Sequence, residues 1–198
     1  MRVVLVDAGG ANIGSLRQAL RRLGVEPELS ADAATIAGAD RVILPGVSTA
    51  AVVMRRLREL GLVEVLRGLQ APLLGVCVGM QLLFEHSEEG DTEGLGLLPG
   101  RVRRLAGGPG LRVPHMGWNR LRRLRDAPLL EGIGDGDFAY FVHGYAAPVG
   151  EHCLAACDHG APFAALVQRG RVAGAQFHPE RSSAAGARLL RNFIGEAA

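Results

Sequence analysis

Short, wholly apolar runs alternate with helical patterns through the first half of the chain, and this alternation limits the possible folds more than any other feature. Strand-like runs lie at Arg2 to Val6, Arg41 to Leu44 and Pro72 to Val76. Apolar residues at helical spacing follow each run, near 13–23, 52–60 and 79–85. Strands that are apolar on both faces and separated by helices indicate parallel β-α-β units, with helices on both faces of the sheet.

The second half has a different pattern, in which strand-like runs are joined by glycine or proline turns. These runs lie at 101–105, 138–142, 153–157, 163–168 and 171–177, and a final helix is predicted near 184–194. Such connections favour antiparallel pairing. We therefore predict a doubly wound α/β fold with a mostly parallel central sheet and an antiparallel β portion in the second half. The length of 198 residues fits one domain over residues 1–198.

The composition argues against several classes of function. The formal net charge is only +2, so the overall charge indicates neither nucleic-acid nor membrane-surface binding. The sequence contains no lysine, which excludes a P-loop lysine, a pyridoxal Schiff base and a lysine general base. No run approaches the ~20 apolar residues of a membrane span, and three cysteines do not suggest a disulfide framework. We therefore expect a cytoplasmic protein.

Cys77 lies between a strand and a helix and is flanked by glycines, in the order Gly75-Val76-Cys77-Val78-Gly79. This arrangement is typical of a nucleophile elbow, in which small neighbours allow a sharp turn that exposes the nucleophile at the carboxyl end of the sheet. The first N–H groups of the following helix favour the thiolate form. From this segment alone, a buried cysteine at an ordinary β-α turn is an equally good interpretation.

His178 and Glu180 follow the last strand-like run, in the segment QFHPE at 176–180. On extended backbone, residues two apart point to the same side, so the carboxylate can fix the imidazole tautomer and stabilise its cationic form. Together with Cys77 they complete a set of nucleophile, base and orienting acid. In doubly wound sheets such groups collect at the carboxyl ends of the strands.

Acyl transfer also needs hydrogen-bond donors for the oxyanion of the tetrahedral intermediate. The backbone N–H of Val78, directly after the candidate nucleophile, is one candidate donor. The turn that contains Gly46 and Val47 is the other, because it follows a parallel strand and glycine permits the backbone to face a substrate oxygen. A plain β-α turn explains that segment as well.

These residues resemble the class I glutamine amidotransferases, which carry a Cys-His-Glu triad. The resemblance spans the chain and is strongest to the glutaminase subunits of imidazole glycerol phosphate synthases. The segments that carry it are LPGV at 44–47, GVCVGMQLLFEHSEEG at 75–90, GLGLLPGRV at 94–102, PHMGWN at 114–119, YFVHGY at 140–145 and QFHPERS at 176–182. The chain departs from the family pattern at Ala8, Ser48, Gly144 and Arg181, where Tyr, Gly, Ser or Thr, and Lys are usual.

The resemblance implies a glutaminase that forms a γ-glutamyl thioester on Cys77, with His178 and Glu180 as catalytic partners. Glutamine is the implied substrate, and no cofactor and no metal are implied. The residues implied to bind the substrate are Gln81 and Glu89, assisted by backbone at His143, Gly144 and Tyr145.

A partner is implied as well, because ammonia released into neutral water becomes mostly ammonium, which is not a nucleophile. The resemblance implies a cyclase subunit with a (β/α) barrel fold, joined to this chain in a heterodimer, which uses the ammonia to close an imidazole ring in histidine biosynthesis. The residues implied at that interface are Asn12, His115, Met116, Gly117, Trp118, Asn119 and Arg181.

Three other interpretations stay open from the sequence. The triad could serve a cysteine peptidase or another amide hydrolase, or the subunit could supply a different synthase, such as one that makes anthranilate or pyridoxal phosphate. The chain could also be a catalytically silent partner-binding module. A metal site around Cys153 and Cys157 is not expected, because four residues of strand span roughly 13 Å, too far for common metal ligation.

Overall fold

An eight-stranded sheet forms the centre of the computed structural model, which describes residues 1–9, 13–46 and 48–195. Its order is β2-β1-β3-β4-β14-β13-β12-β9. The strands from β2 to β14 run parallel, whereas β13, β12 and β9 are antiparallel. The bounds are β1 Val3–Val6, β2 Glu28–Ser30, β3 Arg41–Leu44, β4 Leu73–Val76, β9 Arg122–Arg123, β12 Cys153–His159, β13 Ala161–Arg169 and β14 Val172–Ala175.

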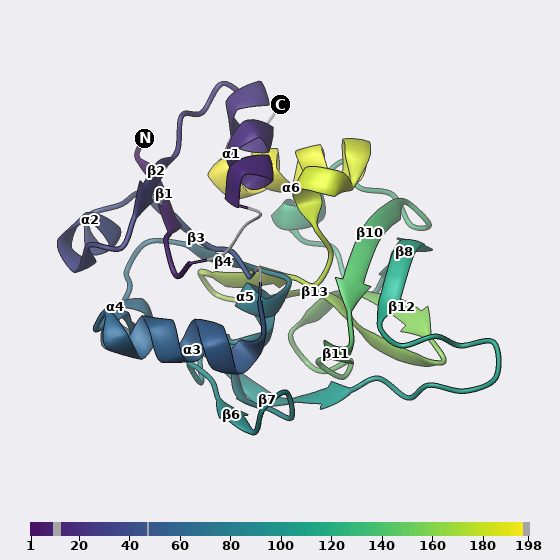
Figure 1. Cartoon of the computed structure of the whole chain (residues 1–198). Coiled ribbons are helices and arrows are strands. Elements are labelled where there is room, and N and C mark those ends of the chain that lie inside the picture. The colour runs from purple at the N-terminus through teal and green to yellow at the C-terminus, as the bar shows by residue number, and fades with distance from the viewer. Residues whose placement is uncertain (10–12, 47, 196–198) are drawn as a thin grey trace.

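Helices cover both faces of this sheet: α1 and α6 lie on one face, and α3 and α4 lie on the other (Figure 1). Every residue of β1 and β4 is buried, as expected for apolar strands between two helical layers. The helices are α1 Ile13–Arg22, α2 Ala33–Ala37, α3 Ala50–Glu59, α4 Leu62–Arg67, α5 Val78–Gln81 and α6 Ser183–Ile194. Within the described ranges, no helix is long and apolar enough to cross a membrane.

Two smaller sheets pack beside the large one. One has the order β11-β7-β5-β6, and the other is the β10-β8 pair. Their strands are β5 Phe84–Ser87, β6 Thr92–Glu93, β7 Leu98–Arg104, β8 His115–Arg120, β10 Phe138–His143 and β11 Tyr145–Ala146. Two 3-10 turns, η1 at Pro128–Leu130 and η2 at Pro179–Arg181, complete the described elements.

The fold class predicted from the sequence is confirmed, including the parallel first half and the antiparallel strands of the second half. One element prediction is wrong in its length. The helix expected over 79–85 ends at Gln81, and Phe84 already belongs to β5. Tertiary pairing overrides the helical pattern there, because β5 pairs with both β6 and β7.

Candidate active site

Cys77 occupies the single-residue turn between β4 and α5, in a strained backbone conformation. Its φ is 55° and its ψ is −113°, a combination that L residues rarely adopt. Such strain costs of order 1–3 kcal/mol and persists only where the surroundings impose it. The Cys77 N–H donates to Ala175 O at 2.7 Å, which ties the turn to the end of β14. The predicted nucleophile elbow therefore has the expected backbone form.

Three glycines leave the space in which this turn fits. A Cβ on Gly79 would lie 1.9 Å from Leu44 O, and a Cβ on Gly46 would lie 2.1 Å from Gly79 N. A Cβ on Gly75 would lie 2.5 Å from Gly79 O. The backbone after β3 thus packs directly against the start of α5, and this contact brings the candidate oxyanion turn at Gly46 beside Val78.

His178 and Glu180 meet at the carboxyl end of β14. His178 Nδ1 and Glu180 Oε1 are 2.9 Å apart, and both side chains are largely buried. The expected extended backbone between them is wrong, because Glu180 lies in the 3-10 turn η2, which begins at Pro179. The turn still brings the carboxylate to the imidazole. The backbone just before this turn is held to β10, because the His178 N–H donates to Tyr140 O at 2.9 Å.

Two hydrogen bonds control the charge of His178. Burial would lower the pKa of His178, but hydrogen bonds to Cys77 and to Glu180 outweigh burial and raise it to about 10. The imidazole is therefore protonated at neutral pH and touches both the sulfur and the carboxylate. Because the ordinary histidine pKa is 6.5, this contact stabilises the fold fully below that pH, and the stabilisation is lost as pH rises through about 10.

Changing Cys77 to alanine should lower the pKa of His178 well below about 10, because the larger of the two stabilising hydrogen bonds is removed. A titration of ¹⁵N-labelled histidine side chains by NMR measures this directly. Cys157→Ala is the matched control, since it removes a buried thiol from β12 and should leave the His178 titration in place. An unchanged His178 pKa in Cys77→Ala would contradict the contact between sulfur and imidazole.

Sequence reasoning missed the role of Gln176, which is fully buried next to the candidate nucleophile. Its Nε2 donates to Cys77 Sγ at 3.8 Å, and its Oε1 accepts from Gln81 Nε2 at 3.0 Å. Gln81 Nε2 also donates to Tyr145 O at 2.7 Å. The only available signal was the place of Gln176 in the QFHPE segment, two residues before His178.

Gln81 presents a free acceptor at this site. Its side chain is buried, both Nε2 hydrogens have acceptors, and Oε1 has no hydrogen-bond partner among the residues that the structure describes. A buried acceptor without a donor is destabilising, so an incoming N–H group would be favoured there.

His143 and His115 form a buried pair beside the same carbonyl. His143 Nδ1 lies 2.8 Å from Tyr145 O, and His143 Nε2 lies 3.1 Å from His115 Nδ1. Burial, with a smaller contribution from neighbouring histidines, lowers the pKa of His143 to about 3 and that of His115 to about 4. Both rings are neutral at pH 7. Because unfolded histidine binds a proton near pH 6.5, this pair stabilises the fold above that pH and loses the effect as pH falls toward 4.

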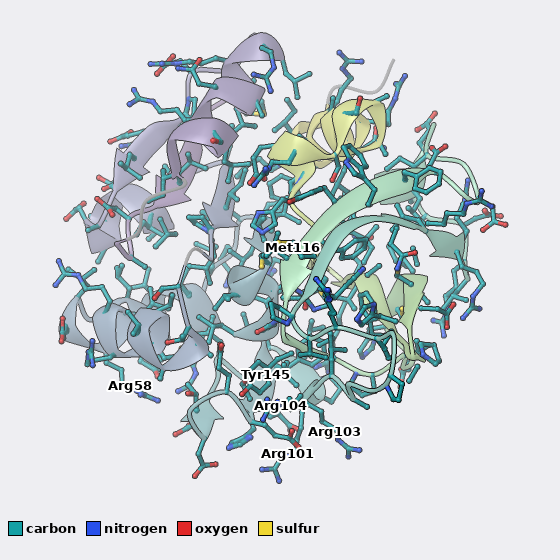
Figure 2. All side chains as sticks on the ribbon, turned by 45° about the vertical axis from the view of Figure 1, so that its right-hand side comes forward. Arg58, Arg101, Arg103, Arg104, Met116 and Tyr145 are labelled. Atoms are coloured by element: carbon teal, nitrogen blue, oxygen red, sulfur yellow. The ribbon has the colours of Figure 1, made fainter. Side chains whose placement is uncertain are left out.

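The other predicted substrate residues have contacts of their own. Glu89 Oε2 accepts from the Ala50 N–H at 2.7 Å, at the start of α3. Gly144 O accepts from the Leu105 N–H, and Tyr145 begins β11 opposite Arg104 of β7 (Figure 2). Val47 and Asn12, predicted for the oxyanion turn and the interface, lie outside the described residues.

The antiparallel β8–β10 pair, which we call the hairpin although β9 and η1 lie between its strands in the chain, carries an exposed apolar face. Met116 and Trp118 on this face are 64% and 53% exposed. Figure 2 labels Met116 beside one end of the β8–β10 pair. Trp118 stands edge-on to Tyr140, and the Arg181 guanidinium lies 4.4 Å from the centre of the Tyr140 ring. We call the side chains of Met116, Trp118, Tyr140 and Arg181 the outer hairpin face.

Not every predicted interface residue reaches this face. His115 is buried on the inner side of the hairpin, and Asn119 is half-buried, with its Nδ2 donating to Asp158 O at 2.9 Å. Gly117 lies between Met116 and Trp118 in β8 at φ 132°, a backbone conformation that favours glycine. The His115 side chain is thus turned away from the outer hairpin face, against Phe141 and His159.

Comparison with known proteins connects the geometry to one family. Residues 4–197 match the family model described as glutamine amidotransferase class-I. The chain is 63% identical over 192 residues to imidazole glycerol phosphate synthase subunit HisH of Xylella fastidiosa (strain Temecula1), covering 97% of this chain and 96% of that one. The subunit of the same name from Xanthomonas axonopodis pv. citri is also 63% identical, with the same coverage.

Solved structures agree in fold. A crystal structure of a glutamine amidotransferase superposes with a TM-score of 0.77 at 25% identity, covering 98% of this chain and 97% of that chain. A structure of PurLQS from Thermotoga maritima gives a TM-score of 0.72 at 20% identity, covering 98% of each chain. The second likeness is one of fold alone.

Proposed function

The chain belongs to the class I glutamine amidotransferases, and from this premise we propose that it is the glutaminase subunit of an imidazole glycerol phosphate synthase in histidine biosynthesis, acting in the cytoplasm. Glutamine and water would give glutamate and ammonia. The contact of His178 with both Cys77 and Glu180 carries the proposal, because it supplies nucleophile, acid and orienting carboxylate in one place.

In the first half of the reaction, Cys77 attacks the side-chain amide carbon of glutamine as its thiolate, the nucleophilic form of a cysteine. The C–S bond forms as the carbonyl becomes an oxyanion, for which the Val78 N–H and the turn at Gly46 are the proposed donors. Collapse of this intermediate breaks the C–N bond. His178, protonated at neutral pH because its pKa is raised to about 10, gives its proton to the departing ammonia.

In the second half, the neutral His178 takes a proton from water, and the hydroxyl oxygen attacks the thioester carbon. A second oxyanion forms and collapses, the C–S bond breaks, and glutamate leaves. Glu180 holds the Nδ1 side of the ring throughout, so Nε2 is the nitrogen that exchanges protons with the sulfur, the ammonia and the water.

Gln81 and the backbone at 143–145 are the proposed recognition elements for the amino-acid end of glutamine. The buried Gln81 Oε1 without a donor supports this role, because a substrate ammonium could supply the missing hydrogen bond. Glu89 would contribute a carboxylate, although its contact with the Ala50 N–H also gives it a capping role at α3.

The relatives' names describe a synthase subunit, so this chain would act in a complex of more than one subunit. We propose that the partner is a (β/α) barrel cyclase and that the complex is a heterodimer. The outer hairpin face supports this proposal, because Met116, Trp118 and Arg181 are the apolar, aromatic and arginine side chains that interfaces favour.

Glutamine turnover should rise when the cyclase subunit from the same organism and its nucleotide-derived ligand are added, because a subunit that supplies ammonia gains from releasing it only to a loaded partner. We expect a rise of at least about tenfold, within the range of typical allosteric coupling. The measurement is glutamate released by the chain alone, with the cyclase, and with cyclase and ligand together.

Two controls distinguish a glutaminase from a peptidase and from a silent binding module. A peptide library incubated with the same complex should stay intact, and cleavage of peptides without glutamine turnover would identify a peptidase instead. A diazo-ketone analogue of glutamine should label Cys77 and no other cysteine. A complex that neither turns over glutamine nor is labelled would be a silent binding module.

A further inference from the structure

A continuous series of hydrogen bonds joins β8 to Gln81 through two buried histidines. Asn119 Nδ2 lies 3.3 Å from His115 Nε2, and His115 Nδ1 lies 3.1 Å from His143 Nε2. His143 Nδ1 then lies 2.8 Å from Tyr145 O, which also accepts from Gln81 Nε2 at 2.7 Å. We call Asn119, His115 and His143 the histidine relay.

The chemistry of the two ends fixes the position of every proton in this relay. Tyr145 O is a carbonyl and can only accept, so His143 Nδ1 must carry a hydrogen. Neutral His143 then has a bare Nε2, which must accept, so His115 Nδ1 must carry a hydrogen as well. Neutral His115 has a bare Nε2, which accepts from Asn119 Nδ2.

The remaining contacts are consistent with this assignment. The Asn119 amide has two hydrogens, and the other one goes to Asp158 O at 2.9 Å. The His115 ring stacks on His159 at 4.2 Å between centroids and on Phe141 at 5.1 Å, which holds its plane. All donors in the relay therefore point in one direction, from β8 toward the carbonyl of Tyr145.

We infer that the histidine relay positions Gln81 for substrate recognition, by holding the Tyr145 carbonyl in the orientation that makes the Gln81 amide present its oxygen to the ligand. A carbonyl oxygen has two lone pairs, and here one accepts from His143 and the other from Gln81. Because the carbonyl can only accept, Gln81 must turn its nitrogen toward it. The oxygen of Gln81 is then the end left without a donor.

His143 and His115 would thus be positioning residues, since neither is argued to touch the substrate with its side chain. The inference rests on the proposed binding of glutamine at Gln81. The inference gives the His143 side chain a role in setting the affinity for the amino-acid end of the substrate. The family resemblance involves His143 only through its backbone.

The tautomers provide the most direct test, and they are measured on the unaltered chain. In ¹⁵N-labelled protein at neutral pH, NMR spectra that correlate ring nitrogens with ring protons should show His143 and His115 both protonated at Nδ1 and bare at Nε2. Assignment uses the signals lost in His143→Asn and in His115→Phe. An Nε2-protonated tautomer or an imidazolium at either residue would overturn the relay.

Kinetics of three variants test the consequence for substrate binding. His143→Phe removes the donor to Tyr145 O and should raise KM for glutamine about tenfold with little change in kcat, because a ground-state hydrogen bond is lost. His143→Asn places an N–H near the former Nδ1 and should restore most of the affinity. His152→Phe, the same change before β12 and outside the relay, should behave like the parent.

The outcomes for the relay and for the proposed function are distinct. If the parent complex turns over glutamine but the KM of His143→Phe equals the KM of His143→Asn, the relay has no positioning role. If the parent complex turns over no glutamine, the proposed function fails, and the NMR tautomers still decide whether the relay exists.

Discussion

Glutamine-dependent ring closure should fall by at least ~10⁴-fold in Cys77→Ala, while ring closure from added ammonium salts stays within about twofold of the parent complex, as expected when a nucleophile is removed but the partner is intact. The physical reason is that alanine cannot form the thioester. The remaining groups around Gly46 and Val78 can only bind glutamine. The measurement is imidazole product formed by the reconstituted complex with each nitrogen source.

Two further variants define the limits of this result. Cys157→Ala removes another buried thiol, in β12, and should keep glutamine-dependent activity. A Cys77→Ala/His178→Ala double variant should be no slower than Cys77→Ala alone, because residues that act as one catalytic unit do not add. Loss of the ammonium-dependent reaction in Cys77→Ala would instead indicate that this residue supports the partner's structure.

Gly79→Ala should lower the free energy of unfolding by about 3 kcal/mol, at the upper end of the usual range for overpacking. The added Cβ would lie 1.9 Å from Leu44 O, and that oxygen belongs to the backbone of β3 and cannot move as a flexible side chain would. For a chain of this length the expected fall in Tm is roughly 6–12 °C. Urea and thermal denaturation measure both quantities.

Gly14→Ala is the matched control for this substitution. Gly14 lies in α1, its Cβ position has no atom within 4 Å, and alanine is the better helix former by ~1 kcal/mol. That variant should be as stable as the parent or slightly more stable. Equal stability of Gly79→Ala and the parent would show that the β3 and α5 backbones are not in the contact described.

The alternation of apolar strands and helices is a local property, and for this reason the sequence predicted the fold class and most of the long elements. The strand near Arg41 and the helix near Ile194 are both present with nearly the expected bounds. Elements that depend on distant partners were not predictable in the same way. The helix after Cys77 ends early because Phe84 enters a strand whose partners lie in β6 and β7.

The candidate site likewise contains some contacts that could be predicted from the sequence and others that could not. The contact of His178 with Glu180 was predictable because the two residues are close in sequence, although the 3-10 turn between them was not. The relay pairs His115 with His143 across two strands of a hairpin, and register is invisible in a single sequence. Gln176 was missed because a buried amide has no sequence signature apart from its neighbours.

The strained backbone of Cys77 predicts how this position would evolve if catalysis were no longer needed. Glycine tolerates a positive φ without strain, so the fold alone would favour glycine at this position, and only the chemistry of a thiol opposes that preference. A lineage released from the need to make ammonia would gain stability by drifting to glycine here. A cysteine in so unfavourable a backbone conformation is what we expect if its thiol is needed for catalysis.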